Sequence, residues 1–322
     1  MATLRVFFAD FWPNFSMENN FIVSALQDQY AIHIDSEHPD YVFFSAFGAK
    51  HFQYPDAVKI YFTGENDVPD FNLCDYGIAY AFIDFEDRYI RLPLYAISNG
   101  YDDWRSKVLS VNHSQLSPQD ADRKFCNFVY SNAQKAHPLR EQFFRLLSQY
   151  KPVDSGGRYL NNIGKPVADK LEFIRNYKFT IAFENSSSDG YTTEKLLDPM
   201  RAHSLPIYWG NPKVGLDFNT SSFINVHDFS SLEAVVDEII FLDTHNEAYL
   251  DKLSQPCVKK GQWVDYKKEL SEFLHHIVEQ PLPTAKRAVR YGFNDYYTQR
   301  QRISSALYSN KIARPLLKKL IG

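Results

Sequence analysis

Residues 179–195 have the sequence Phe179-Thr-Ile-Ala-Phe-Glu-Asn-Ser-Ser-Ser-Asp-Gly-Tyr-Thr-Thr-Glu-Lys195. An apolar run comes first, a polar segment rich in serine follows it, and a helical pattern of apolar residues begins at Thr192. This order predicts a buried strand, a loop and a helix, which together form the repeating unit of parallel α/β sheets.

The same alternation continues on both sides of this segment. In the carboxy-terminal half we predict strands at 125–130, 205–209 and 223–226 and helices at 138–150, 169–176, 192–203, 231–242 and 266–279. Nearer the amino end we predict strands at 4–9, 31–34, 41–45, 58–62, 76–82 and 89–94 and a helix at 17–29. Two such series predict an α/β protein with two Rossmann-like halves.

A polar segment separates the two series. Residues 112–124 lose the apolar periodicity and are rich in Ser, Gln, Asp and Pro, as linkers are. We therefore predict a first domain at 1–118, a second domain at 119–300 and a basic tail or helix at 301–322.

Composition excludes several other classes of protein. The 322 residues are 44% hydrophobic and 23% charged, so the chain is neither disordered nor fibrous. Its net charge of -4 gives no overall attraction to nucleic acid, and no nucleic-acid partner is expected. No window reaches the roughly 18 apolar residues that a membrane span needs. The three cysteines form no CxxC pair and predict free thiols in a reducing compartment, hence a cytoplasmic protein.

Charge is concentrated at the carboxyl end. From Lys286 onward the chain has nine basic residues and one acidic residue, Asp295, so this part carries +8 and the remainder -12. Residues 303–321 mix Leu and Ile with Lys and Arg, a pattern that favours peripheral contact with an anionic membrane surface. A terminal helix that docks on the protein with its basic face in water is an equal alternative.

The start of the helix after 179–183 is a candidate anion site. Helix N–H groups, the helix dipole and Lys195 suit a diphosphate, and the segment has neither GxGxxG nor P-loop spacing. A sugar-nucleotide diphosphate therefore fits better than a dinucleotide. Arg140, in the first turns of the helix after 125–130, is a second candidate for gripping phosphate oxygens. An ordinary capped helix and a surface arginine are the alternatives.

Glu65 is a candidate base in the first half. It lies in Tyr61-Phe-Thr-Gly-Glu-Asn66, directly after an apolar strand and a glycine turn, and ligands of α/β sheets bind beyond the carboxyl ends of the strands. Local capping or ion pairing is the alternative for an isolated glutamate.

A metal site is not predicted. Asp120-Ala-Asp122 has the DxD form that some glycosyltransferases use for Mn²⁺, but it lies in the polar linker and follows no apolar strand. The histidines have no paired ligand spacing.

Three motifs carry a resemblance to a known family. Phe183-Glu-Asn-Ser186, Gly190-Tyr-Thr-Thr-Glu-Lys195 and Leu205-Pro-Ile-Tyr-Trp-Gly210 resemble the donor-binding signature of the α-1,3/4-fucosyltransferases. Residues 61–66 and Asp70-Phe-Asn-Leu-Cys-Asp-Tyr76 look like the acceptor domain of its bacterial members.

The resemblance implies a GT-B fold, in which two Rossmann-like domains face each other across a cleft. The acceptor would bind to the amino-terminal domain and GDP-fucose to the carboxy-terminal domain. The roles implied are a general base for Glu65, diphosphate clamps for Arg140 and Lys195, a ribose ligand for Glu194, donor contacts for Asn185 and Tyr191, and contact with fucose or its developing positive charge for Glu184. No cofactor is expected to be essential, and stimulation by a divalent metal stays open.

The function predicted is inverting transfer of L-fucose from GDP-fucose to O3, or O4, of GlcNAc in a Galβ1-4GlcNAc (N-acetyllactosamine) acceptor, giving a Lewis x type product. Two alternatives stay open. An inverting glycoside hydrolase would use Glu65 with a second carboxylate such as Glu184. A sugar-binding module without catalytic activity would use aromatic surfaces alone.

Overall fold

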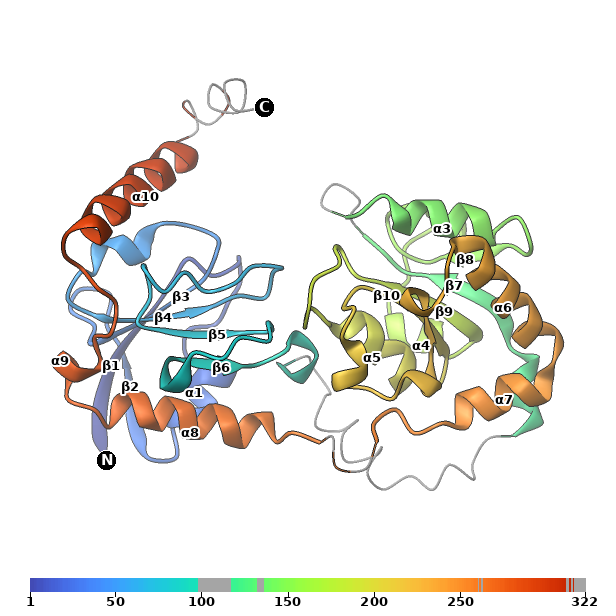
Figure 1. The fold of residues 1–322 in the computed structure, drawn as a ribbon, viewed down its shortest axis with the longest axis horizontal. Coiled ribbons are helices and arrows are strands. Elements are labelled where there is room, and N and C mark those ends of the chain that lie inside the picture. Colours follow the sequence, from blue (N-terminus) through green and yellow to red (C-terminus); the bar gives the residue numbers. More distant parts are fainter. Residues whose placement is uncertain are drawn as a thin grey trace. The chain divides into compact units, whose positions relative to one another are not determined.

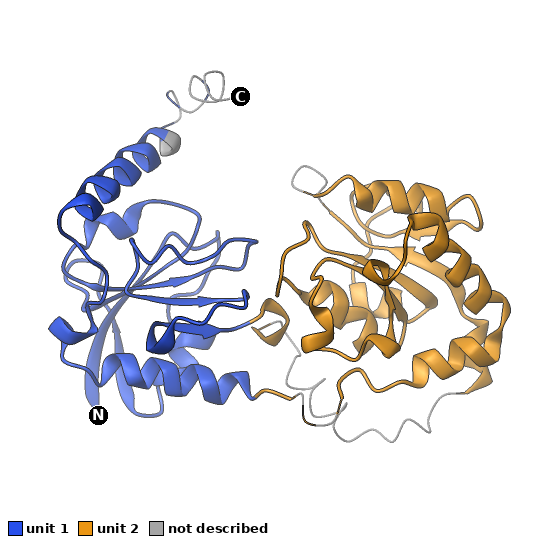
Figure 2. Cartoon of the chain, in the orientation of Figure 1, with its two compact units in different colours: residues 1–92, 265–322 blue, residues 93–264 orange. Residues whose placement is uncertain are grey.

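The chain forms two compact units in a computed structural model that describes residues 1–97, 117–131, 136–259, 261, 263–310, 313 and 315. Unit 1 comprises Met1–Leu92 and Asp265–Gly322, and unit 2 comprises Pro93–Val264 (Figure 2). Each unit is built on its own parallel sheet (Figure 1), so the expectation of two Rossmann-like α/β units is confirmed.

Unit 1 contains a six-stranded sheet in the order β2-β1-β3-β4-β5-β6, and every neighbouring pair of strands is parallel. Its central strands are buried along their whole length, as in sheets covered on both faces. The strands are β1 (Ala2–Ala9), β2 (Tyr30–Ile34), β3 (Tyr41–Phe44), β4 (Val58–Phe62), β5 (Tyr76–Ala79) and β6 (Tyr89–Arg91).

The helices of unit 1 come from both ends of the chain. They are α1 (Phe21–Leu26), α8 (Tyr266–Val278), α9 (Leu282–Ala285) and α10 (Phe293–Ser309). Helix α8 lies beside α1 (Figure 1), and the Ser271 hydroxyl donates to the Ala25 carbonyl at 3.0 Å. Beyond α8, the buried carboxylate of Asp75 accepts hydrogen bonds from the backbone N–H groups of Arg287 and Ala288, both at 2.7 Å.

The units therefore divide the chain differently from the predicted domains 1–118, 119–300 and 301–322. The first boundary falls after Leu92, and the chain returns to unit 1 at Asp265. The physical reason is the apolar face of α8, whose buried side chains lie in unit 1, where the helix contacts α1 and β6. These side chains are Tyr266, Leu270, Leu274 and Ile277.

Unit 2 contains a five-stranded parallel sheet in the order β11-β10-β9-β7-β8. Its strands are β7 (Lys124–Phe128), β8 (Val153–Ser155), β9 (Tyr177–Phe183), β10 (Leu205–Trp209) and β11 (Ile224–Asn225). Among its described residues, the α-helices are α3 (Leu139–Leu147), α4 (Lys170–Ile174), α5 (Glu194–Arg201), α6 (Leu232–Thr244) and α7 (Asn246–Ser254). The central strand β9 is buried throughout. The loop that leads from β9 to α5 therefore begins at the carboxyl edge of the sheet.

Most predicted strands and helices are present, and several are shorter than predicted. The predicted strand 76–82 ends at Ala79, and the predicted helix 17–29 is confined to α1. The predicted linker 112–124 and the predicted helix 303–321 lie partly outside the described residues. Among the described residues, no helix has the length and apolar composition needed to cross a bilayer.

Candidate active site

A buried carboxylate organises the turn between β9 and α5. Glu184 directly follows β9, and its side chain is fully buried. The Thr193 N–H donates to Glu184 Oε1 at 2.8 Å, and the Thr193 hydroxyl donates to Glu184 Oε2 at 2.8 Å. Since Thr193 is also the N-cap of α5, Glu184 fixes the position at which the helix begins.

Lys195 lies in the first turn of α5 between two carboxylates. Its Nζ is 3.2 Å from Glu184 Oε2 and 3.5 Å from Glu194 Oε1. Burial alone would lower the pKa of Lys195, but Glu184 and Glu194 raise it above its ordinary value. Lys195 is therefore charged at neutral pH, at the helix end where the dipole also favours an anion.

Arg140 approaches the same turn from α3. Its guanidinium is buried, lies 4.1 Å from the centre of the Tyr130 ring, and donates through Nη2 to the Phe183 carbonyl at 3.0 Å and to Asn185 Oδ1 at 2.8 Å. Its Nε has no hydrogen-bond partner among the described residues. Because a buried N–H is rarely left unpaired, this donor is suited to a ligand.

Arg140 and Lys195 line a cavity of about 430 Å³. Binding sites for small molecules commonly have volumes of about 300–1,000 Å³, so the cavity is large enough for a bound nucleotide sugar to enter in part. Arg140, Lys170 and Lys195 give its wall positive charge, and Glu194 is the one acidic residue among its described lining residues. The arrangement suits a diphosphate with neighbouring hydroxyl groups.

The predicted donor-side residues do not all lie on this wall. Arg140, Asn185, Glu194 and Lys195 line the cavity together. Glu184 and Tyr191 are buried and are not among its described lining residues. Glu184 holds Lys195 and Thr193, and its predicted role toward the fucose or its developing positive charge stays a prediction.

Sequence reasoning missed Tyr130, Gly157 and Lys170, which also line the cavity. A Cβ atom on Gly157 would lie 1.9 Å from the Tyr130 carbonyl oxygen, so only glycine permits this approach of two backbones. The pair Gly156-Gly157 directly after β8 is the signal that could have revealed this wall.

Glu65 lies in unit 1, in the loop after β4. Its side chain is exposed, its N–H donates to the Thr63 hydroxyl at 3.0 Å, and its carbonyl accepts from the Asp67 N–H at 2.8 Å. The backbone of Glu65 is thus fixed while its carboxylate is accessible. Its role as a base stays a prediction.

Asp120 has a structural role in the linker. It forms the capping box of the short 3₁₀ helix at Pro118–Asp122, where it accepts from the Ser117 N–H at 2.8 Å, and it pairs with Arg123. Among the described residues, His, Cys, Asp and Glu side chains form no group of three suited to a metal ion.

Two parallel α/β units, one with a cationic cavity beyond its strands, agree with the GT-B class of glycosyltransferases, the fold class of the similar solved fucosyltransferases. The sequence model for the α-(1,3)-fucosyltransferase FucT N-terminal domain matches residues 6–98, and that for the glycosyltransferase family 10 (fucosyltransferase) C-terminal region matches residues 100–254. The chain belongs to this fucosyltransferase family, which confirms the resemblance seen in the motifs.

Individual relatives agree with this assignment. The chain is 36% identical over 290 residues to an α-(1,3)-fucosyltransferase FucT of Helicobacter pylori, an alignment that covers 78% of this chain and 59% of that protein. A crystal structure of an α1,3-fucosyltransferase is similar with a TM-score of 0.74 and 33% identity, over 87% of this chain and 91% of the other. A crystal structure of an α1,3-fucosyltransferase with GDP-fucose has a TM-score of 0.72 and 30% identity, over 87% and 92%.

Proposed function

We propose that this chain transfers L-fucose from GDP-fucose to O3, or O4, of GlcNAc in an N-acetyllactosamine-type acceptor, with inversion at the fucose carbon. Family membership and the likeness to an α1,3-fucosyltransferase crystallised with GDP-fucose support the donor and the reaction type. The acceptor and the linkage rest on the motifs of residues 61–76 and on the relatives named as α-(1,3)-fucosyltransferases.

The observation that carries the proposal is the cavity of unit 2 with Arg140 and Lys195 on its wall. In the transition state, negative charge grows on the diphosphate oxygens as the bond to fucose breaks. Cations already in place stabilise this charge more in the transition state than in the ground state. We assign the diphosphate to Arg140 and Lys195, the ribose to Glu194, and donor positioning to Asn185 and Tyr191.

The acceptor hydroxyl must lose a proton as it attacks. We assign this proton to Glu65, because an exposed carboxylate on a fixed loop at the end of β4 is accessible to an alcohol. Positioned bases of this kind contribute roughly 10²- to 10⁴-fold to the rate.

We propose that a divalent metal is not essential, because protein cations can serve the diphosphate in its place. Transfer measured with excess chelator is then expected to retain most of the activity, and added Mg²⁺ or Mn²⁺ to change it only modestly. Complete loss with chelator and full recovery with metal would contradict this part of the proposal.

The test of function is incubation with GDP-fucose and a panel of disaccharides, followed by NMR determination of the new linkage. The panel contains Galβ1-4GlcNAc, Galβ1-3GlcNAc and lactose. We expect fucose on O3 of GlcNAc in the first compound. Release of fucose from fucosylated glycans without GDP would favour a hydrolase, and glycan binding without turnover would favour a sugar-binding module.

We also propose peripheral contact with the cytoplasmic face of a membrane through the carboxyl end. On and beside α10, Tyr291, Phe293 and Ile303 are highly exposed, and Arg300 and Arg302 lie on the same helix. Exposed apolar side chains with nearby cations are typical of segments that lie on anionic lipid. Flotation with vesicles of anionic lipid, compared with neutral vesicles, tests this contact, and equal recovery with both would contradict it.

A further inference from the structure

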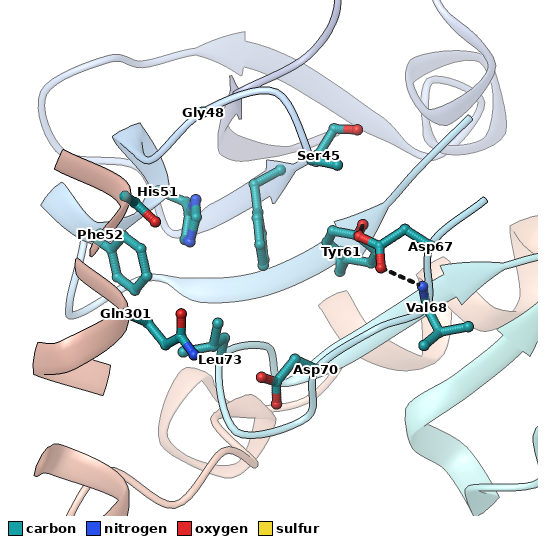
Figure 3. A pocket seen from close by; sticks show the side chains of 13 residues that line it. Ser45, Gly48, His51, Phe52, Tyr61, Asp67, Val68, Asp70, Leu73 and Gln301 are labelled. Carbon is teal, nitrogen blue, oxygen red and sulfur yellow. Dashed lines mark hydrogen bonds between the residues drawn. The ribbon is translucent and has the colours of Figure 1, made fainter. Parts of the chain in front are cut away.

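A second pocket, of about 210 Å³, lies in unit 1 between the face of the sheet and α10 (Figure 3). The strand residues Phe44 and Tyr61, which are register partners, form its floor. Gln301 and Ser305 of α10, one helical turn apart, close it on another side. None of the residues assigned to fucosyl transfer lines this pocket.

Helix α10 is tied to the rim of the pocket. The Tyr297 hydroxyl donates to Asp70 Oδ2 at 2.6 Å, and the Asn294 side-chain amide donates to the Asn72 carbonyl at 3.1 Å. Tyr297, Gln301 and Ser305 share one helical face, so the contact with Asp70 sets which side chains face the pocket.

His51 is buried in the pocket wall in a fixed orientation. Its ring stacks on Phe44 with centroids 4.1 Å apart, and its Nδ1 lies 2.7 Å from Asp10 Oδ2. Because a carboxylate only accepts hydrogen bonds, the ring proton lies on Nδ1 and Nε2 is left as an acceptor. Burial lowers the pKa of His51 against the opposing effect of Asp10, so the ring is neutral at neutral pH.

The acceptor on His51 is unused. His51 is 5% exposed, and its Nε2 has no hydrogen-bond partner among the described residues. Asp10 in turn is held by the N–H groups of Lys50 and His51, at 2.8 and 3.0 Å, and Gly48 leaves it room, since a Cβ there would lie 2.3 Å from Asp10 Oδ1. A buried acceptor fixed in this way is suited to a donor from a ligand.

The lining selects a class of ligand. None of the described lining residues is a lysine or arginine, and Asp67 and Asp70 give the rim negative charge, which disfavours phosphates and carboxylates. Phe52, Val68 and Leu73 add apolar surface. Oxygen and nitrogen acceptors beside apolar faces suit a neutral molecule that has both hydroxyl groups and C–H faces, as a sugar ring has. The volume is small for more than one such ring.

We propose that this pocket binds one neutral sugar unit of the acceptor, with a ring hydroxyl donating to His51 Nε2. The pocket and the proposed base share a loop, since Asp67 follows Glu65 by two residues. That the sugar belongs to the acceptor rests on the fucosyl transfer proposed above. That the pocket binds a sugar is independent of that proposal.

The test places an indole in the pocket from α10. Ser305→Trp puts it on the face that lines the pocket, and Ser304→Trp puts it on the neighbouring exposed position as a matched control. We expect Ser305→Trp to raise the acceptor KM by about tenfold or more, with the KM for GDP-fucose unchanged, and Ser304→Trp to change neither. An unchanged acceptor KM in Ser305→Trp, or an equal rise in both variants, would overturn the proposal.

A direct binding measurement separates this proposal from the proposed function. Saturation-transfer NMR with methyl β-galactoside, methyl β-N-acetylglucosaminide and N-acetyllactosamine needs no turnover. His51→Phe keeps the stacking on Phe44 but removes the acceptor, and we expect it to weaken sugar binding about three- to tenfold without changing GDP affinity. If the wild type binds the sugar but transfers no fucose, and Ser305→Trp no longer binds the sugar, the sugar site is supported. The same result contradicts the proposed fucosyl transfer. Normal transfer with unaltered sugar signals in Ser305→Trp and His51→Phe contradicts the pocket alone.

Discussion

Lys195 is the residue on which the proposed donor site depends most. It is nearly enclosed, stays charged because Glu184 and Glu194 raise its pKa, and lies on the cavity wall at the start of α5. A charge-assisted hydrogen bond contributes about 1.5–3 kcal/mol, more than a neutral one.

We expect Lys195→Ala to weaken GDP binding by about tenfold or more, measured by calorimetry. Removing the lysine also leaves the Glu184 carboxylate buried without its cation, so the melting temperature is measured alongside. Lys195→Arg keeps the charge and is expected to bind GDP better than the alanine variant. Lys252→Ala, on α7 and outside the cavity lining, is the control. Wild-type GDP affinity in Lys195→Ala would remove this residue from the donor site.

Gly157 tests the shape of the same wall. The clash predicted for a Cβ is with backbone atoms of Tyr130, which cannot rotate away. Overpacking of this kind costs about 1–3 kcal/mol, so we expect Gly157→Ala to lower the free energy of unfolding and to weaken GDP binding. Gly215→Ala, whose added atom would make an ordinary 3.4 Å contact, is expected to do neither. Equal unfolding curves for the two variants would contradict the backbone approach described here.

At the scale of elements, α8 determines which unit the carboxyl end joins. Leu270, Leu274 and Ile277 are buried at the spacing of one helical face. Because Leu274 is fully buried, Leu274→Ala is expected to reduce the free energy of unfolding by about 2–5 kcal/mol in urea. Glu272→Ala, on the exposed side of the helix, is the control and is expected to change it little. A small effect of Leu274→Ala would mean that α8 is not part of the unit 1 core.

Lys59 of β4 is a buried lysine within electrostatic reach of Arg290 and Asp75. The pKa of Lys59 is lowered to about 8, chiefly by burial and also by Arg290, while Asp75 opposes the change. Between this pKa and the ordinary lysine value the unfolded chain binds the additional proton, so the free energy of unfolding increases as pH rises from 8 to 9.5.

We expect this increase to be about 1–2 kcal/mol in urea titrations and to be absent in Lys59→Met, which has no group to titrate. An equal pH dependence in the two proteins would show that Lys59 keeps its ordinary pKa in the folded state.

The elements also show how far the sequence alone could be interpreted. The apolar pattern of 266–279 predicted a helix correctly, but nothing in its own residues says which of two sheets it covers. Arg140 and Lys195 were predicted from local position and motif, and they do share one cavity. The contact between Gly157 and Tyr130 could not be predicted from the sequence, because it depends on the paths that the backbone takes after β7 and after β8. Asp10 and His51, far apart in sequence, meet for a similar reason.

For the whole molecule, the proposed reaction needs contributions from both units. In this proposal the cations for the leaving diphosphate come from unit 2, and the carboxylate that takes the proton comes from unit 1. Since the two tasks lie on separate units, they can be tested independently by changing one and measuring the other.

The most direct measurement compares fucosyl transfer with GDP affinity in Glu65→Gln, with Glu37→Gln as an exposed control in the same unit. We expect Glu65→Gln to reduce the transfer rate by about 100-fold to 10,000-fold, because the amide cannot accept the proton, while GDP affinity by calorimetry stays within about twofold of the wild type. Turnover near the wild-type rate in Glu65→Gln would contradict the assignment of the base and, with it, the proposed division of labour.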